Sequence, residues 1–238
     1  MRLVKRAING LLHRFGYDIV RLGEHCDAPF NLLELVVHAY VSTHEQFYFV
    51  QIGANNGIRS DHLYPLVRSY HLRGLLVEPL PDQFEELRRN YAAEPQVRFE
   101  NCAIANEEGE RSLYRFRRAA AVPDWAYGMA SFDKRHLTKF QDTAVLDRYV
   151  EVVPVPTMTF ASLMAKHGMG HVSLLHIDTE GHDYEILKMV FAAGCFPPII
   201  NFEHQHLRGA DLVACKQTLV EHQYRYVNYG RDTLALRQ

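Results

Sequence analysis

The chain has 238 residues, which is enough for one domain with a full hydrophobic core but not for two large domains. Hydrophobic residues make up 47% and charged residues 23%, as in ordinary soluble globular proteins, and the formal net charge of −2 provides no global basic field for nucleic-acid binding. The four scattered cysteines form no Cys-x-x-Cys pair, so we expect a reduced, cytoplasmic chain without structural zinc.

The first residues predict a basic amphipathic helix. Apolar residues recur at helical spacing from Leu3 to Phe15 with basic residues among them, and Gly16 stops the pattern. Such a helix can make peripheral contact with an anionic membrane, but more often its apolar stripe packs on its own domain or on a second subunit, and we prefer that interpretation. No apolar run reaches the roughly 18–20 residues of a membrane span, and we expect no signal peptide.

Helix and strand patterns then alternate along the chain. The first half predicts helices over 31–44, 61–70 and from Pro81 onward, with strands over 47–52, 74–77 and 97–101. The second half predicts strands over 150–155, 173–178 and 199–203, with helices over 159–167 and 180–193. Near-continuous apolar strands between helices are typical of a parallel sheet that is covered on both faces.

Two segments depart from this alternation. Residues 111–117 alternate like an exposed strand, and residues 118–142 show no clear period, as expected of a lid or a mobile linker. Trp125 and Tyr127 in this segment could stack on a substrate or fill a small core of the segment itself. At the end of the chain, residues 224–229 and 233–237 predict an antiparallel hairpin.

The first two strands end in residues suited to hold a nucleoside. A glycine turn from Gly53 to Gly57 follows the first strand, and Glu78 follows the second, 25 positions after Gly53 (78 − 53). Glycine lets the backbone approach a ligand closely, and a carboxylate at the next strand end accepts hydrogen bonds from both ribose hydroxyls. The third glycine of a dinucleotide fingerprint is missing, which favours a single nucleoside such as S-adenosylmethionine. Glu78 could instead cap the helix that starts near Pro81.

Polar residues also end the later strands. Asn101, Cys102 and Ala103 follow the third strand, where they would border an adenine. Asp178 and Glu180 follow the fourth strand and exceed what helix capping requires, although capping is the simpler alternative. After the fifth strand, Glu203 and His204 would face the same cavity, and His206 is as readily a solvated loop residue. A histidine can accept a proton at physiological pH, so His204 is a candidate general base.

These motifs together resemble the FkbM family of S-adenosylmethionine-dependent methyltransferases. The similar pieces are the Gln-Ile-Gly-Ala-Asn-Asn-Gly turn at 51–57, the Leu-Leu-Val-Glu-Pro strand at 75–79, the Ile-Asp-x-Glu-Gly-x-Asp signature at 177–183, and Glu203-His204. The Arg-Phe-Gly-Tyr opening at 14–17 and the Ala-Ser-Phe-Asp segment at 130–133 are similar as well. The resemblance covers roughly residues 10–238 in the same order. One departure is Gln51, where many methyltransferases carry an acid.

The resemblance implies an α/β protein with a Rossmann-like, seven-stranded class I methyltransferase sheet, mostly parallel and closed by an antiparallel hairpin, with helices on both faces. We expect an N-terminal helical extension over 1–45 that packs on the core, and a methyltransferase domain over 46–238 with an inserted lid at about 118–142. The implied cofactor contacts are Gln51, Gly53, Ala54, Asn55, Gly57, Glu78 (ribose), Pro79, Asn101, Cys102, Ala103 (adenine) and Asp178 (sulfonium).

The implied reaction is methylation of a hydroxyl or carboxyl oxygen on a small molecule such as a sugar or secondary metabolite. For a hydroxyl acceptor, His204 or His182 is the candidate base, with Asp178 and Glu203 orienting it. A carboxylate acceptor would need no base. Asp178 and Glu203-His204 also resemble the magnesium ligands of metal-dependent O-methyltransferases, but histidine is a poor magnesium ligand, so a divalent cation is not the preferred interpretation.

Three other functions remain as alternatives. An NAD(P)-dependent oxidoreductase shares the Rossmann-type sheet, but the missing third glycine and the terminal hairpin argue against it. A non-catalytic nucleoside-binding module would not be expected to keep carboxylates for both the ribose and the acceptor. A nucleic-acid methyltransferase usually carries a basic track and often an Asn/Asp-Pro-Pro-Tyr-type motif, and the sequence shows neither. The identity of the acceptor and the oligomeric state cannot be read from these residues.

Overall fold

The computed structural model describes residues 31–59, 61–118, 124–140 and 149–238, with only the backbone described for 124–125 and 138–140. The predicted N-terminal helix, Cys26 and the side chain of Trp125 therefore lie outside the described residues. The chain divides into two compact units, Met1–Phe30 and Asn31–Gln238. The helix predicted over 31–44 belongs to the second unit, where it forms α2 (Leu32–Val41).

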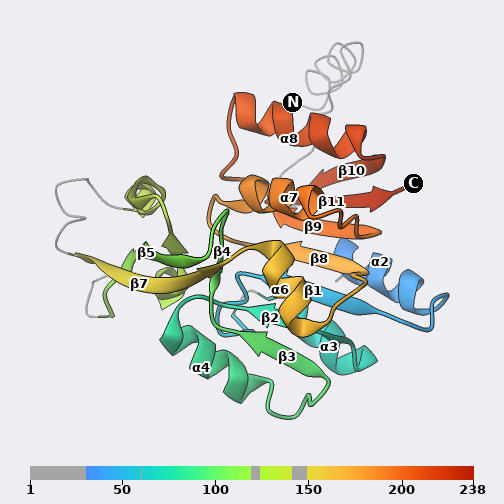
Figure 1. Cartoon of the computed structure of the whole chain (residues 1–238), viewed down its shortest axis with the longest axis horizontal. Helices are drawn as coiled ribbons and strands as arrows, with labels where there is room; N and C mark the ends of the chain where they lie inside the picture. Colours follow the sequence, from blue (N-terminus) through green and yellow to red (C-terminus); the bar gives the residue numbers. More distant parts are fainter. Residues whose placement is uncertain (1–30, 60, 119–123, 141–148) are drawn as a thin grey trace, which may run out of the picture. The chain divides into compact units, whose positions relative to one another are not determined.

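A seven-stranded sheet forms the centre of the second unit (Figure 1). Its strands, in spatial order, are β10 (Tyr224–Tyr229), β11 (Asp232–Arg237), β9 (Ile199–Glu203), β8 (Leu174–Ile177), β1 (Tyr48–Ile52), β2 (Arg73–Val77) and β3 (Val97–Glu100). The five strands from β9 to β3 are parallel, and β11 runs antiparallel to both β9 and β10. The predicted fold class, a mostly parallel sheet closed by an antiparallel hairpin, is confirmed.

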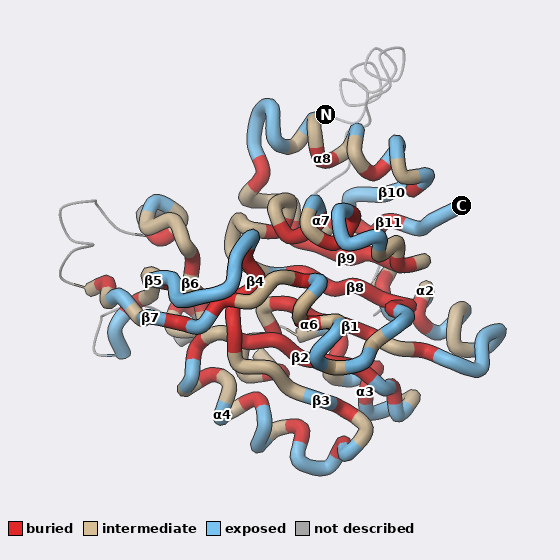
Figure 2. The backbone as a smooth tube through the Cα atoms, viewed as in Figure 1, coloured by how far each residue is buried: buried red, intermediate tan, exposed pale blue. Residues whose placement is uncertain are grey.

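Helices cover both faces of this sheet because successive strand residues point to opposite sides. Val50 and Ile52 of β1 pack in a cluster with α6 (Phe160–His167), α7 (Asp183–Ala192) and α8 (Ala210–Glu221). Phe49 of the same strand packs in the opposite cluster with α2, α3 (Tyr64–Tyr70) and α4 (Pro81–Asn90). Figure 2 shows the central strands as buried and the outer turns of the helices as exposed. Neither α8 nor the short strand β4 (Ala103–Ile104) was predicted from the sequence.

The predicted start of α7 at residue 180 is wrong, because the helix begins at Asp183. Glu180 and Gly181 have φ angles of 52° and 104°, in the left-handed region that a helix cannot continue through. The predicted start of α3 at residue 61 is also wrong, because Asp61 instead accepts a hydrogen bond from the backbone of Leu63 (2.7 Å) ahead of the helix. In both cases a turn precedes the helix.

A second sheet arises from the region between β3 and α6. Its order is β4, β7 (Val150–Met158), β5 (Gly109–Phe116) and β6 (Ala130–Ser131). The segment 118–142, predicted to have no regular structure, contains β6 and two 3-10 helices, η1 (Asp124–Gly128) and η2 (Lys134–Phe140). Strand β7 also continues past its predicted end at residue 155, although Pro154 and Pro156 interrupt the strand pattern. Both prolines pair only with β5, because the pairing with β4 begins at Thr157.

We expect Gly74→Ala to lower the free energy of unfolding by about 1–3 kcal/mol, because a β-carbon at this position in β2 would overlap the ring of Phe49. Gly170→Ala is the matched control, since no atom lies near the added carbon and the change should stay within about 0.5 kcal/mol. Urea titration of both variants measures the difference. Adding Phe49→Leu to Gly74→Ala should recover part of the loss, and equal stability of the two single variants would contradict this account of the packing.

Candidate active site

A cavity of about 420 Å³ lies where the parallel strands of the main sheet end. In α/β sheets this edge is where ligands bind, because the loops after neighbouring strands converge there. The cavity is lined by residues that follow β1, β2, β3, β8 and β9, and by residues of the second sheet region. Nine of the sequence-predicted cofactor residues line it: Gln51, Gly53, Ala54, Asn55, Glu78, Pro79, Cys102, Ala103 and Asp178. The other two, Gly57 and Asn101, do not.

The glycine turn after β1 lies tightly between the neighbouring strands. The backbone amides of Gly53 and Ala54 both donate to the carbonyl of Val77 (3.0 Å each). Gly53 has a φ of 85°, and a β-carbon there would overlap the carbonyl of Asp178. Only glycine therefore permits β1 and β8 to end this close together.

Gly57 has a different role from the one predicted. A β-carbon at Gly57 would meet the side chains of Leu87 and Tyr91, which lie at the end of α4 and just after it. Its missing side chain serves the packing of α4 beneath the turn rather than contact with the cavity.

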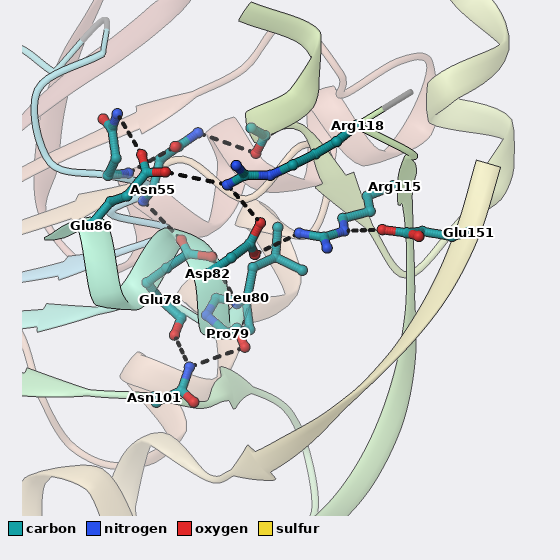
Figure 3. Close-up of polar contacts among 12 residues, drawn as sticks. Asn55, Glu78, Pro79, Leu80, Asp82, Glu86, Asn101, Arg115, Arg118 and Glu151 are labelled. Carbon is teal, nitrogen blue, oxygen red and sulfur yellow. Dashed lines mark hydrogen bonds and ion pairs between the residues drawn. The ribbon is translucent and has the colours of Figure 1, made fainter. Parts of the chain in front are cut away.

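Glu78 connects the glycine turn to the start of α4 (Figure 3). One carboxylate oxygen accepts from the backbone amide of Asn55 (2.8 Å) and the other from that of Leu80 (2.9 Å). Each carboxylate oxygen can accept more than one hydrogen bond, so acceptor capacity remains for a ligand. Glu78 is 4% exposed, and burial raises its pKa to about 7. The helix-capping and ligand-binding interpretations of Glu78 are thus compatible.

Asn101 stabilises the strand ends from outside the cavity. Its amide nitrogen donates to the carbonyls of Glu78 (2.7 Å) and Pro79 (3.1 Å), as Figure 3 shows. It holds the end of β3 against the residues that follow β2.

The second sheet region forms a wall of the cavity through Gly128, Met129, Ala130 and Phe132. Two groups of polar contacts hold it in place. The side chain of Asn55 donates to the carbonyl of Gly128 (3.1 Å).

The second group consists of ion pairs that join the second sheet region to α4 (Figure 3). Arg115 of β5 reaches Asp82 of α4 (2.6 Å) and Glu151 of β7 (2.7 Å). Arg118 contacts Asp82 (3.1 Å) and Glu86 (3.2 Å). The Arg115 side chain is only 15% exposed, so its ion pair with Asp82 is screened less by solvent than a fully exposed pair.

Carboxylates gather near the ends of β8 and β9. Asp178 is open to the cavity, yet its pKa is raised well above the ordinary value by the surrounding protein and by Glu203, Glu180 and Asp183. Asp183 is fully buried, and burial together with Glu203 raises its pKa to about 7. It accepts from the hydroxyl of Thr179 (3.1 Å) and the amide of Gly181 (3.2 Å). This concentration of negative charge favours a cationic ligand.

The histidines are arranged differently from the sequence prediction. His204 does not line the cavity, and its ring nitrogen instead meets the hydroxyl of Thr233 (3.0 Å). His206 lines the cavity and lies between Glu180 (3.1 Å) and Glu203 (2.9 Å). Burial disfavours its charge, but hydrogen bonds with these two carboxylates outweigh burial and raise its pKa to about 9.

His182 also lines the cavity, as predicted for a site residue, but burial lowers its pKa to about 4. It is therefore neutral at physiological pH. Its ring meets that of Phe132 edge to face, with centroids 5.2 Å apart. His182 thus links the loop after β8 to the wall formed by the second sheet region.

Arg59 lines the cavity although the sequence analysis did not identify it. One guanidinium nitrogen of Arg59 is enclosed and has no hydrogen-bond partner among the described residues. The same is true of the amide oxygen of Gln51, whose nitrogen donates to Asp61 (3.3 Å). The unsatisfied groups of the cavity-lining residues therefore include a cationic donor and an amide acceptor. The only feature of the sequence that could have indicated Arg59 is its position as a basic residue shortly after the glycine turn. Its spacing from the turn does not predict whether its side chain points into the cavity.

The family model for the methyltransferase FkbM domain matches residues 51–226, most of the chain. This chain belongs to that family. Among solved structures, the FkbM methyltransferase of Methylobacillus flagellatus KT shares the fold, with a TM-score of 0.51 and 14% identity over 81% of this chain. That alignment covers 44% of the other protein, so this FkbM-family chain spans less than half of its length.

Two further structures align with nearly the whole FkbM-family chain. A putative caffeoyl-CoA O-methyltransferase from Staphylococcus aureus has a TM-score of 0.47 and 8% identity, covering 98% of this chain and 91% of its own. A human methyltransferase 10 domain containing protein has a TM-score of 0.46 and 12% identity, covering 98% and 95%. No curated protein is detectably similar in sequence. Among the described residues, no helix has the length and apolar character needed to cross a membrane.

We expect Asp183→Asn to weaken the pH dependence of stability. The pKa of Asp183 is about 7 in the folded protein against 3.8 for an ordinary aspartate, so its ionisation disfavours the folded state. That penalty is absent below about pH 4, grows as the pH rises, and is complete above about pH 7. The fall in melting temperature between pH 5 and pH 8 should therefore be smaller in the variant than in wild type. Asp211→Asn, at an exposed position on α8, is the control, and identical pH profiles for all three proteins would contradict the assignment.

Proposed function

We propose that this FkbM-family protein transfers a methyl group from S-adenosylmethionine to an oxygen atom of a small molecule. The observation that carries the proposal is a set of three groups in one cavity that can still bind a ligand: the Glu78 carboxylate with spare acceptor capacity, the unsatisfied Gln51 oxygen and the unsatisfied Arg59 nitrogen. Family membership supports methyl transfer, while the cofactor, the oxygen acceptor and the small-molecule class remain our inference.

The cofactor's parts match these groups chemically. Glu78 suits the two ribose hydroxyls, and Cys102 and Ala103 supply a small, weakly polar surface for adenine. Gln51 and Arg59 are complementary to the ammonium and carboxylate of an amino-acid tail, since an amide oxygen accepts from the first and a guanidinium donates to the second. Asp178 and its neighbouring carboxylates suit the positive sulfonium.

When bound, the cofactor supplies an activated methyl group: the carbon–sulfur bond breaks with its electron pair left on sulfur, and the acceptor oxygen forms the new carbon–oxygen bond. The protein must align the acceptor and exclude water. Asp178 is our candidate for the proton acceptor, because it lines the cavity and a bound sulfonium would favour its ionised form, which can take a proton.

This choice replaces His204 as the candidate base, since the His204 side chain is turned to Thr233. A carboxylate acceptor would need no base, and Asp178 would then only position it. The cavity volume of about 420 Å³ is within the range of small-molecule sites. A nucleic-acid acceptor would need a basic track, whereas Asp178, Glu180 and Glu203 make this edge of the cavity acidic.

The first test is calorimetric titration with S-adenosylmethionine, S-adenosylhomocysteine and NADH. We expect binding of the first two, no binding of NADH, and about a 10- to 100-fold loss of affinity in Glu78→Gln, because hydrogen bonds to charged groups contribute about 1.5–3 kcal/mol. Glu85→Gln is the matched control, because Glu85 is exposed, pairs with Arg88 on α4 and does not line the cavity. Binding of NADH alone would replace the proposal with an oxidoreductase, and unchanged affinity in Glu78→Gln would contradict the ribose assignment.

A second test concerns the amino-acid tail. We expect Arg59→Gln to weaken S-adenosylhomocysteine binding by about 10- to 100-fold, the loss of one charge-assisted hydrogen bond. It should leave the affinity for 5′-methylthioadenosine unchanged, because that nucleoside lacks the carboxylate. Parallel titrations of both ligands measure this difference. An equal loss for the two ligands would assign Arg59 a structural role, and no loss for either would remove it from the site.

A further inference from the structure

Three side chains on the acidic side of the cavity bring together one nitrogen and two carboxylate oxygens. They belong to Glu180, which follows β8, and to Glu203 and His206 at the end of β9, and their nearest ligand atoms all lie within 4.8 Å of one another. All three residues line the cavity proposed to hold the cofactor.

This cluster is enclosed by protein. Glu203 is 8% exposed, and the side chain of His206 is 1% exposed. A carboxylate is rarely buried as far as that of Glu203 without a positive partner, because removing its hydration costs several kcal/mol. The position that the three side chains surround therefore favours a positive charge.

The hydrogen bonds within the cluster are incomplete. His206 Nε2 lies 3.1 Å from Glu180 Oε2 and 2.9 Å from Glu203 Oε2, but neither oxygen receives a well-directed hydrogen bond from a described residue. A single proton on Nε2 cannot point at both oxygens. The amide nitrogen of Gln205, which can only donate, lies 3.1 Å from the same Nε2 and also donates to the other oxygen of Glu203. The proton on His206 can therefore satisfy only one of the two oxygens, whereas a divalent cation in its place can accept lone pairs from all three atoms.

We propose that Glu180, Glu203 and His206 bind a divalent first-row cation, for which Mn²⁺ is the representative. Carboxylate oxygens favour hard cations, and an imidazole nitrogen moves the preference from Mg²⁺ toward the transition metals. Three protein ligands leave coordination positions open. The set differs from the one that the sequence analysis considered, because His206 takes the place of His204 and Glu180 that of Asp178.

The role of the cation rests on the proposed function. A divalent cation beside Asp178 would coordinate the acceptor hydroxyl and lower its pKa, and the proton would pass to the Asp178 carboxylate as the oxygen takes the methyl group. Open positions on the cation suit an acceptor that offers two neighbouring oxygens, such as a vicinal diol or an α-hydroxy acid.

The test is titration of the full chain with Mn²⁺. Binding is measured as the loss of the free-ion signal in electron paramagnetic resonance. We expect saturable binding of one ion, weakened by more than about tenfold in Glu203→Gln and in His206→Gln, since even residues that only orient metal ligands contribute that much. His204→Gln and Glu185→Gln should bind as wild type does, because His204 faces Thr233 and Glu185 pairs with Lys188 on α7.

A measurement on the wild type alone keeps the proposal testable if a variant does not fold. Pulsed resonance of the bound ion should show coupling to an imidazole nitrogen. No Mn²⁺ binding, absence of this coupling, or unchanged binding in folded Glu203→Gln and His206→Gln would overturn the site. Titration with S-adenosylhomocysteine separates the two proposals: nucleoside binding without Mn²⁺ binding removes only the cation, and site-specific Mn²⁺ binding without nucleoside binding removes only the cofactor assignment.

Discussion

The close approach of Gly53 to the carbonyl of Asp178 is the constraint on which the rest of the site depends. It lets β1 and β8, the central neighbours of the parallel sheet, end side by side. The turn after β1 then comes within reach of Glu78, whose carboxylate binds the Asn55 amide and the start of α4. Asn55 in turn binds Gly128. A chain of short contacts thus runs from the centre of the sheet to the wall of the cavity.

The charge distribution of the cavity opposes the stability of the unliganded protein. Asp178, Asp183 and Glu203 lie close together, and their mutual repulsion and burial raise the pKa values of both aspartates. Such local conflicts are expected at functional sites, where the rest of the fold compensates for them. A sulfonium and a divalent cation would each relieve the repulsion. The same physical feature therefore connects the proposed cofactor and the proposed metal ion.

The second sheet shows where local patterns lose their predictive value. Its strands pair residues far apart in sequence, such as Arg115 with Glu151, and its central strand contains Pro154 and Pro156. Neither helical nor strand periodicity marks segment 118–142, because β6 has two residues and the 3-10 helices are short. Tertiary contacts, including the ion pairs of Arg115, give this region its structure. The cavity wall that this region forms was consequently the least predictable part of the site.

Local patterns in the sequence are sufficient to predict the class of the fold and the strand ends that form the site. Near-continuous apolar strands, glycine after β1 and Glu78 after β2 are local features, and parallel pairing brings the carboxyl ends of the strands to one edge. Which side chains point into the cavity could not be predicted in this way. His204 and His206 are two residues apart, yet the turn after β9 directs one to Thr233 and the other to Glu180. Arg59 likewise lines the cavity because of the path of the loop after β1. Beyond a strand end, the direction of a side chain depends on the path of its loop, and that path is set by contacts with distant residues.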